Sequence, residues 1–134
     1  MRNSTKSKIV LPTAGELRLL EVLWQLGEGT IDEIISHSGG NPPPNYKTVQ
    51  TLLRIMETKK LVTHTLRGRA FVFRPEVARS AINKSSTHSF LERYFGGSRT
   101  ALLLNLLEDE SIDPDELKKL EELIRRRRKA IRRA

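Results

Sequence analysis

The chain has 134 residues, 24 of them basic and 16 acidic, giving a net charge of +8 and an isoelectric point near 10.2. This length fits one domain, or one small domain with an appendage, and the basic balance favours nucleic acid or another anionic surface as partner. The sequence contains no cysteine, which excludes disulfides, iron–sulfur clusters and thiolate metal sites.

Hydrophobic residues make up 37% of the chain and aromatic residues only 5%, which is low for a single compact globule. We therefore expect much apolar surface to be exposed or buried against a partner subunit. No apolar run approaches the roughly 20 residues that span a bilayer, and the basic, polar start lacks the apolar core of a signal peptide. These features predict a cytoplasmic protein without a membrane partner.

Residues 1–11 are expected to form a flexible basic arm. Two capping boxes follow, one from Thr13 to Glu16 and one from Thr30 to Glu33, and each predicts the start of a helix. Leucines recur at helical spacing after the first box, and isoleucines after the second. Gly27 is expected to end the first helix, and Gly39-Gly40 the short second one.

Three consecutive prolines, residues 42–44, cannot be helical, so a loop precedes the next element. Asn45 is expected to cap a third helix with an apolar face at Val49, Leu52, Leu53 and Met56. After residue 60 the hydrophobic period changes from 3.6 to 2. This change predicts strands over 61–66 and 70–73, a turn near Arg67-Gly68, and an end at Pro75.

From about residue 76 the pattern is helical again, with an aromatic cluster and several leucines. Ser98 is expected to cap one helix, and Asp113-Pro114 to begin the last one. The net charge is +5 over residues 1–75, −1 over 76–112 and +4 over 113–134. The near-neutral, leucine-rich middle suits an interface between subunits. The predicted dimer-interface residues are Phe90, Leu91, Tyr94, Phe95, Leu102, Leu103, Leu106, Leu107, Leu117, Leu120, Leu123 and Ile124.

The order of helix, helix, proline loop, helix and hairpin is that of a winged helix-turn-helix domain, expected over residues 12–75. In such domains the third helix enters the major groove of DNA and the hairpin, or wing, contacts the backbone or minor groove. Gln50 suits adenine, Lys47 and Arg54 suit guanine or phosphate, and the threonines suit phosphate or a thymine methyl. The predicted DNA-binding residues are Tyr46, Lys47, Thr48, Gln50, Thr51, Arg54, Arg67 and Arg69.

Three alternatives stay open at this point. The polar side of the third helix could be no more than its solvated face. The protein could also bind nucleic acid or the nucleoid without sequence preference, although no aromatic platform for RNA is visible. The amphipathic basic end, residues 117–133, could bind a membrane surface. The agreement of charge, helix order, polar face and wing favours sequence-specific recognition of double-stranded DNA.

Several short stretches also occur in a characteristic order. They are Leu23-Trp24 with Gly27, Thr30, Lys47 to Leu53, Leu61-Val62, Gly68-Arg69, Phe73-Arg74-Pro75, Phe95 to Ser98, and Asn105. On these residues the sequence resembles the BlaI/MecI family of penicillinase-repressor-type regulators from about Leu11 to Ile124. The resemblance implies a winged-helix domain, a helical dimerisation domain over residues 76–134 with a basic C-terminal end, and repression by a homodimer on a palindromic operator.

The sequence departs from the family pattern at three places. Ile55-Met56 replaces the usual Arg-Leu, with the arginine at Arg54, and Lys60 replaces a glycine, so the turn after the third helix is expected to differ. Some family members are inactivated by cleavage of an Asn-Phe bond. The corresponding candidate proteolytic site here is Asn105-Leu106, which would imply an inducing protease or sensor as a further partner.

No catalytic function is predicted. The sequence lacks a glycine-rich phosphate loop, a nucleophile elbow and an HExxH motif. His37, His64 and His88 are far apart and without carboxylates at metal-ligand spacing, so each is interpreted as a surface or packing residue. The absence of cysteine excludes the copper sensing of some family members. We therefore expect neither a metal nor a cofactor.

Overall fold

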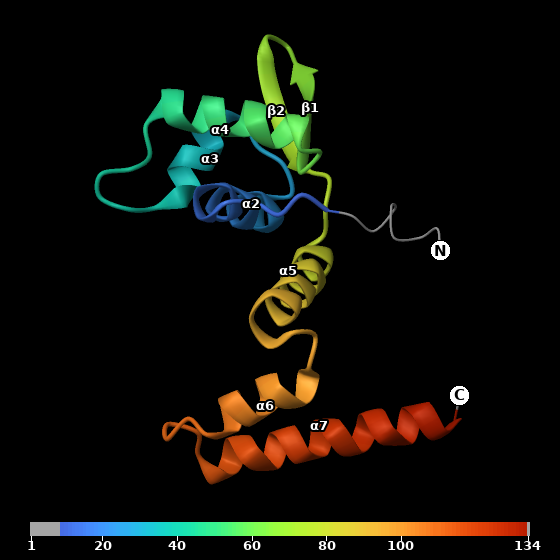
Figure 1. The fold of residues 1–134 in the computed structure, drawn as a ribbon. Coiled ribbons are helices and arrows are strands. Elements are labelled where there is room, and N and C mark those ends of the chain that lie inside the picture. The colour runs from blue at the N-terminus through green and yellow to red at the C-terminus, as the bar shows by residue number, and fades with distance from the viewer. Residues whose placement is uncertain (1–8, 134) are drawn as a thin grey trace. The chain divides into compact units, whose positions relative to one another are not determined.

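A computed structural model describes residues 9–133 of the chain (Figure 1). The elements are α2 (Ala14–Leu26), α3 (Ile31–Ser38), α4 (Tyr46–Thr58), β1 (Val62–Arg67), β2 (Ala70–Pro75), α5 (Arg79–Phe95), α6 (Arg99–Leu107) and α7 (Pro114–Arg133). This mainly helical fold with one antiparallel hairpin confirms the predicted fold class. Most of the predicted arm, residues 1–8, and residue 134 lie outside the described residues. None of the described helices is long and apolar enough to cross a membrane.

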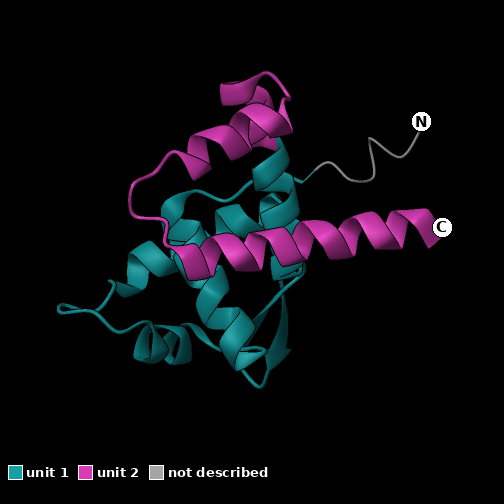
Figure 2. Ribbon diagram, turned by 90° about the horizontal axis from the view of Figure 1, so that it is seen from below, with its two compact units in different colours: residues 1–88 teal, residues 89–134 magenta. Residues whose placement is uncertain are grey.

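The chain divides into two compact units, residues 1–88 and residues 89–134 (Figure 2). The division falls within α5, so this helix contributes to both units. The first unit contains α2, α3, α4 and the hairpin, in the order of a winged-helix domain. The second contains the end of α5, α6 and α7.

Both predicted capping boxes are present and set the starts of α2 and α3. The Thr13 hydroxyl accepts a hydrogen bond from the Glu16 amide at 3.2 Å, and the Glu16 carboxylate accepts one from the Thr13 amide at 3.0 Å. Thr30 and Glu33 repeat this exchange at 3.2 and 2.8 Å. These reciprocal bonds satisfy amide groups that the first helical turn leaves without partners.

The third helix, α4, also begins as the sequence predicts. The side-chain oxygen Oδ1 of Asn45 accepts from the backbone amides of Lys47 at 2.8 Å and Thr48 at 3.4 Å. The proline loop therefore ends at a defined residue, and this cap determines which side chains occupy the first turn of the helix.

The end of α4 is a tight left-handed turn at Lys60, whose φ is 66°. The Leu61 amide donates to the Met56 carbonyl at 2.9 Å, and the Lys60 amide donates to the Glu57 carbonyl at 3.0 Å. This pair of bonds is the Schellman motif, in which glycine usually occupies the left-handed position. Lysine takes that position here. The buried side chains of Leu61 and Met56 supply the apolar contact that accompanies the motif.

Strands β1 and β2 pair in register from Val62 with Pro75 to Arg67 with Ala70, which leaves a two-residue turn. Gly68 occupies the first turn position with a φ of 64°, as a tight hairpin turn requires. The base of the hairpin is held to the loop before α3, because Gly29 and Phe73 exchange two backbone hydrogen bonds of 2.9 and 2.8 Å. The wing therefore projects from a fixed base.

The core of the first unit is made by one apolar face from each element. Its fully buried members include Leu20, Leu23, Ile34, Leu53, Met56, Leu61 and Val62. Ile9, within the predicted arm, also packs against this core. Burying a side chain of this size stabilises a fold by about 1.5–3 kcal/mol, so this set can hold the small unit together.

The first unit extends past the predicted boundary at residue 75, because the start of α5 packs onto α2. The Trp24 indole N–H donates to the Val77 carbonyl at 2.9 Å, and the Arg79 guanidinium lies 4.7 Å from the centre of the Trp24 ring. Ile82 is 4% exposed and joins the core. These contacts anchor the first turns of α5 on the winged-helix unit.

Glu16, in the first unit, is the one charged residue that is buried among residues 9–133, and it is 2% exposed. Its two carboxylate oxygens accept hydrogen bonds from the Lys59 ammonium at 2.8 and 3.0 Å. Burial alone raises the pKa of Glu16, but the bonds from Lys59 and Thr13 and the charge of Lys59 reverse this effect and leave the pKa below its ordinary value. The pair therefore stabilises the fold at neutral pH, and this contribution is lost as the pH falls through the lowered pKa.

The second unit has almost no core of its own. Of its described residues, 89–133, only Leu91 is buried. Its helices nevertheless begin at the predicted caps, because the Ser98 hydroxyl accepts from the Ala101 amide at 3.0 Å and the Asp113 carboxylate accepts from the Glu116 amide at 2.8 Å. Local signals define these helices, while most of their leucines face outward.

Replacing Lys60 with glycine should stabilise the protein. A residue with a Cβ atom loses roughly 1–2 kcal/mol in the left-handed conformation, and glycine avoids this loss at some cost in chain entropy. Lys60→Gly should therefore raise the free energy of unfolding by up to about 1 kcal/mol in urea titrations at fixed protein concentration. Lys60→Ala, which keeps the Cβ atom, is the matched control and should show no such gain. A less stable Lys60→Gly variant would contradict this interpretation of the turn.

Candidate nucleic-acid interface

The polar side of α4 is accessible along its length. Val49, Leu53 and Met56 are buried in the core, and this orientation turns the opposite face outward. Of the predicted DNA-binding residues on α4, Gln50 is half-buried and the others are exposed, namely Tyr46, Lys47, Thr48, Thr51 and Arg54. The solvent-accessible side of the helix thus presents uncharged hydrogen-bond donors and acceptors together with two cations.

Three of the predicted residues meet around a small cavity. Tyr46 and Gln50 from α4 line a hollow of about 280 Å³ together with Arg69 from the wing turn. Thr30 and Asp32 at the start of α3 line its other side. The fold therefore places the wing arginine near the glutamine that the sequence singles out for base recognition.

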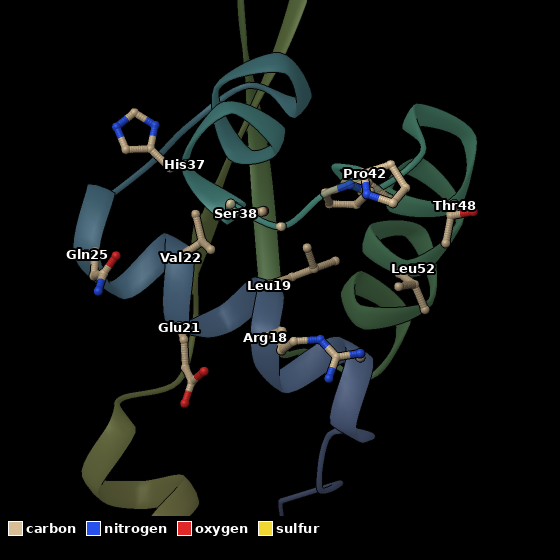
Figure 3. Close-up of a pocket in the computed structure, with 15 residues that line it drawn as sticks. Arg18, Leu19, Glu21, Val22, Gln25, His37, Ser38, Pro42, Thr48 and Leu52 are labelled. Atoms are coloured by element: carbon tan, nitrogen blue, oxygen red, sulfur yellow. The ribbon is translucent and has the colours of Figure 1, made fainter.

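Thr48 lies apart from this group. Two residues along a helix correspond to a rotation of about 200°, so Thr48 and Gln50 lie on nearly opposite sides of α4. Thr48 lines a separate cleft of about 640 Å³ between α2, the loop after α3 and α4, together with Arg18 and Pro42 (Figure 3). Thr48 and Gln50 are therefore not brought together on one surface. Arg18 was not among the site residues predicted from the sequence.

The two wing arginines differ in their surroundings. The Arg67 guanidinium donates to the Glu28 carboxylate at 2.8 Å, and both side chains are largely exposed. Exposed ion pairs contribute only about 0.2–1 kcal/mol, so a phosphate group could displace Glu28. Arg69 has no ion-pair partner among residues 9–133. Local spacing could not have identified Glu28, because it lies 39 positions before Arg67.

A second polar contact holds the wing against α4. Both carboxylate oxygens of Glu57 lie 2.8 Å from Nδ1 of His64 on β1. The His64 ring stacks on Phe71 of β2, with ring centres 4.4 Å apart. His64 is thus a packing residue, as predicted, and it couples the hairpin to the third helix. Glu57 was not among the predicted site residues, because the sequence carries no local signal for this contact.

The charges on this surface are mainly positive. Lys47 and Arg54 on α4 and Arg69 on the wing are exposed and have no acidic partner within the described part of the chain. Cations free of neutralising partners attract the phosphate backbone of nucleic acid and release its counterions on binding. Together with the half-buried Gln50, they combine backbone attraction with a group able to distinguish bases.

The predicted dimer-interface residues all lie in α5, α6 and α7. Leu91 is buried within its own chain, and Phe95, Leu102 and Leu120 are half-buried. The other members of the set are exposed, namely Phe90, Tyr94, Leu103, Leu106, Leu107, Leu117, Leu123 and Ile124. The candidate proteolytic site, Asn105-Leu106, is exposed at the end of α6 and has helical backbone. No cluster of metal-ligating side chains occurs within the described residues.

The order of elements and the polar face of α4 can be compared with known proteins. Residues 12–126 match the family model described as "Penicillinase repressor". The chain belongs to the penicillinase repressor family. This membership confirms the resemblance predicted from the sequence and identifies the chain as a repressor of that family, not an enzyme.

Two curated relatives cover nearly the whole chain. The chain is 28% identical to the penicillinase repressor of Bacillus licheniformis over 117 residues, which span 87% of this chain and 91% of that protein. It is 20% identical to the methicillin resistance regulatory protein MecI of Staphylococcus aureus over 115 residues, which span 86% and 94%. A solution structure of monomeric Bacillus licheniformis BlaI with the blaP half-operator is 28% identical, covers 55% of this chain and 90% of that one, and has a TM-score of 0.46.

Removing the wing arginines should weaken binding to every DNA sequence by a similar factor. Arg67→Ala and Arg69→Ala should each lower the slope of log affinity against log salt by about 0.9 for each phosphate group that the arginine neutralises. Glu28→Ala is the matched control, since it removes the competing carboxylate and should leave the slope unchanged or steeper. Fluorescence anisotropy at several salt concentrations measures these slopes. Unchanged slopes in both arginine variants would show that the wing does not touch the DNA backbone.

Proposed function

We propose that this repressor acts as a symmetric homodimer on an inverted-repeat operator in double-stranded DNA. The observation that carries the proposal is the exposed polar face of α4, with Gln50 beside the wing residue Arg69, in a chain of the penicillinase repressor family. The third helix of such a domain fits the major groove, where every base pair presents a different pattern of donors and acceptors.

The side chains on α4 have separate roles in this proposal. Gln50 pairs with adenine through N6 and N7, because its amide offers one donor and one acceptor at the right spacing. Lys47 and Arg54 contact guanine or phosphate, and Thr51 contacts phosphate or a thymine methyl. Tyr46 lines the same cavity as Gln50. Thr48, on the side of the cleft, contacts the backbone rather than the base edges read by Gln50.

The proposal of a dimer rests on the apolar side chains that the second unit leaves exposed. Its exposed apolar side chains include Leu106 at 53%, Leu123 at 53% and Ile124 at 52% exposure. A groove of about 490 Å³ between the end of α6 and α7 is lined by Leu107, Leu117, Leu120 and Ile124. A monomer would leave these side chains in water, whereas a second copy packed against them supplies the missing core.

The two-fold symmetry of a dimer determines the form of the operator. Each copy of α4 contacts one half-site, so the two half-sites are inverted repeats of each other. Their centres lie on one face of the duplex, separated by about one helical turn or a multiple of it. Operator DNA lies in the cytoplasm of a bacterium, and we therefore assign the protein to that compartment.

Inactivation by an inducing protease is a further part of the proposal. The Asn105-Leu106 bond lies in helical backbone near the end of α6, with both side chains exposed. Cleavage there requires the last turn of the helix to open, because proteolytic nicking favours exposed, locally unfolded segments. Loss of the following α7 would remove most of the residues that line the groove and separate the dimer.

Gln50→Ala should reduce specificity without reducing general attraction to DNA. Removal of one bidentate pairing should cost about 1–3 kcal/mol on the operator and relax preference at one position in each half-site. Non-specific binding should hardly change, because glutamine carries no charge. Competition between the operator and its single-base variants measures this preference. Thr58→Ala, at the far end of α4, is the control. Equal affinity of the unmodified chain for operator and scrambled DNA would instead support a nucleoid-type protein.

The oligomeric state can be tested through the exposed face of α7. Light scattering of the unmodified chain should give about twice its 15.3 kDa mass. Leu123→Glu combined with Ile124→Glu should shift the mass to that of a monomer, because charges are costly inside an apolar interface. Leu66→Glu, at an exposed position on β1, is the matched control and should remain dimeric. A monomeric unmodified chain at micromolar concentration would exclude this interface.

A further inference from the structure

The last part of α7 carries a dense positive charge that the family match does not cover. Residues 125–133, hereafter the basic segment, contain six arginines and one lysine and no acidic residue. The matched family region ends at residue 126, while α7 continues as a helix to Arg133. Most of the basic segment is therefore an addition to the region that defines the family.

These charges are available to a partner. Every residue of the basic segment is exposed. Within residues 9–133, the one ion pair in this segment joins Arg125 to Glu122 at 2.8 Å, one turn earlier on the helix. Arginines at a helix C-terminus are favoured by the helix dipole, but this effect is confined to the last turn and accounts only for Arg132 and Arg133. The remaining cations have no explanation within the fold.

Helix α7 is amphipathic in a way that keeps several charges of the basic segment accessible in a dimer. Leu117, Leu120, Ile124 and Ile131 follow one another at intervals of three, four and seven residues and share one face of α7. Arg125, Lys129 and Arg132 share another face at similar spacing. If the apolar face packs against a second copy, the cationic face still points into solvent.

The composition favours DNA over a membrane surface. A helix that lies on a bilayer needs several large apolar side chains opposite its charges, and the basic segment has only Ile131 of this kind. Arginine is preferred over lysine by six to one, and its planar guanidinium binds phosphate through two hydrogen bonds. A nine-residue helix is about 13 Å long, and duplex DNA carries one negative charge per roughly 1.7 Å of its axis, so several cations can be neutralised at once.

We propose that the basic segment of α7 binds the phosphate backbone of duplex DNA, without sequence preference, as a second contact in addition to α4 and the wing. This inference rests on the proposed function, since it assumes that the chain acts on DNA. The segment then raises affinity for operator and scrambled DNA alike, and this contribution depends strongly on salt.

The test compares two full-length variants. In the first, Arg128, Lys129, Arg132 and Arg133 are changed to glutamine, which is a good helix former and carries no charge. In the second, Arg128→Lys, Arg132→Lys and Arg133→Lys keep the charge. Circular dichroism and light scattering confirm that both variants retain helix content and mass. Binding to a scrambled duplex and to an operator duplex of equal length is measured at several salt concentrations.

The glutamine variant should lose affinity for both duplexes by the same factor, at least about tenfold at low salt. Its slope of log affinity against log salt should fall by about 0.9 for each phosphate group that is no longer neutralised. The lysine variant should keep the slope. An unchanged slope in the glutamine variant would overturn the inference. So would charge-dependent sedimentation with vesicles of anionic lipid at physiological salt, if the slope on DNA stayed the same.

The two proposals fail in different ways. The ratio of operator to scrambled affinity reports on the proposed function, whereas the change of slope on scrambled DNA reports on the basic segment. If the ratio is high and the slope does not change, only the inference is wrong. If the ratio is near one and the slope still falls in the glutamine variant, the operator proposal is wrong and the basic segment binds DNA nevertheless.

Discussion

The winged-helix unit depends on a buried ion pair between its first and third helices. Glu16, at the start of α2, is inaccessible and accepts two hydrogen bonds from Lys59, which follows the end of α4. A buried carboxylate without a partner is strongly destabilising, so α4 must lie where its last residues can reach Glu16. The same carboxylate completes the capping box with Thr13. One side chain thus fixes both where α2 begins and how the helix that carries Gln50 is placed against it.

The two units differ in how far they bury their apolar side chains. The first unit buries one apolar face from each of its elements, and the start of α5 adds Ile82 to that core. The second has one buried residue among those described, so its helices keep their apolar faces exposed within one chain. In the proposed dimer this unit would gain its stability from association, and its folding would depend on protein concentration. In the proposed mechanism, repression would respond to protein level or to cleavage of α6 without any change in the DNA-binding unit.

Features set by neighbouring residues were predictable from the sequence, and features set by distant contacts were not. The caps at Thr13, Thr30 and Asn45 act within a few positions, so their residue types alone predicted the helix starts. The packing of Trp24 at the start of α5 joins residues 53 positions apart, and no local sequence pattern predicts it. The ion pair of Arg67 with Glu28 likewise joins residues that are distant in the sequence. The set of polar residues on α4 was predictable, but the separation of Thr48 from Gln50 follows from the rotation of the helix against its core.

The two proposals place base recognition and attraction to phosphate in separate parts of this molecule. Gln50 is uncharged and half-buried beside the wing, so its contribution depends on geometry and hardly on salt. The arginines of the wing and of the basic segment are exposed, so they attract any phosphate and fix no base. A repressor must find a few sites among a large excess of other DNA, and specificity is the ratio of these two kinds of binding. If the basic segment of α7 binds DNA as proposed, its charge raises both affinities equally and leaves that ratio unchanged, so it alters occupancy and search without altering the operator.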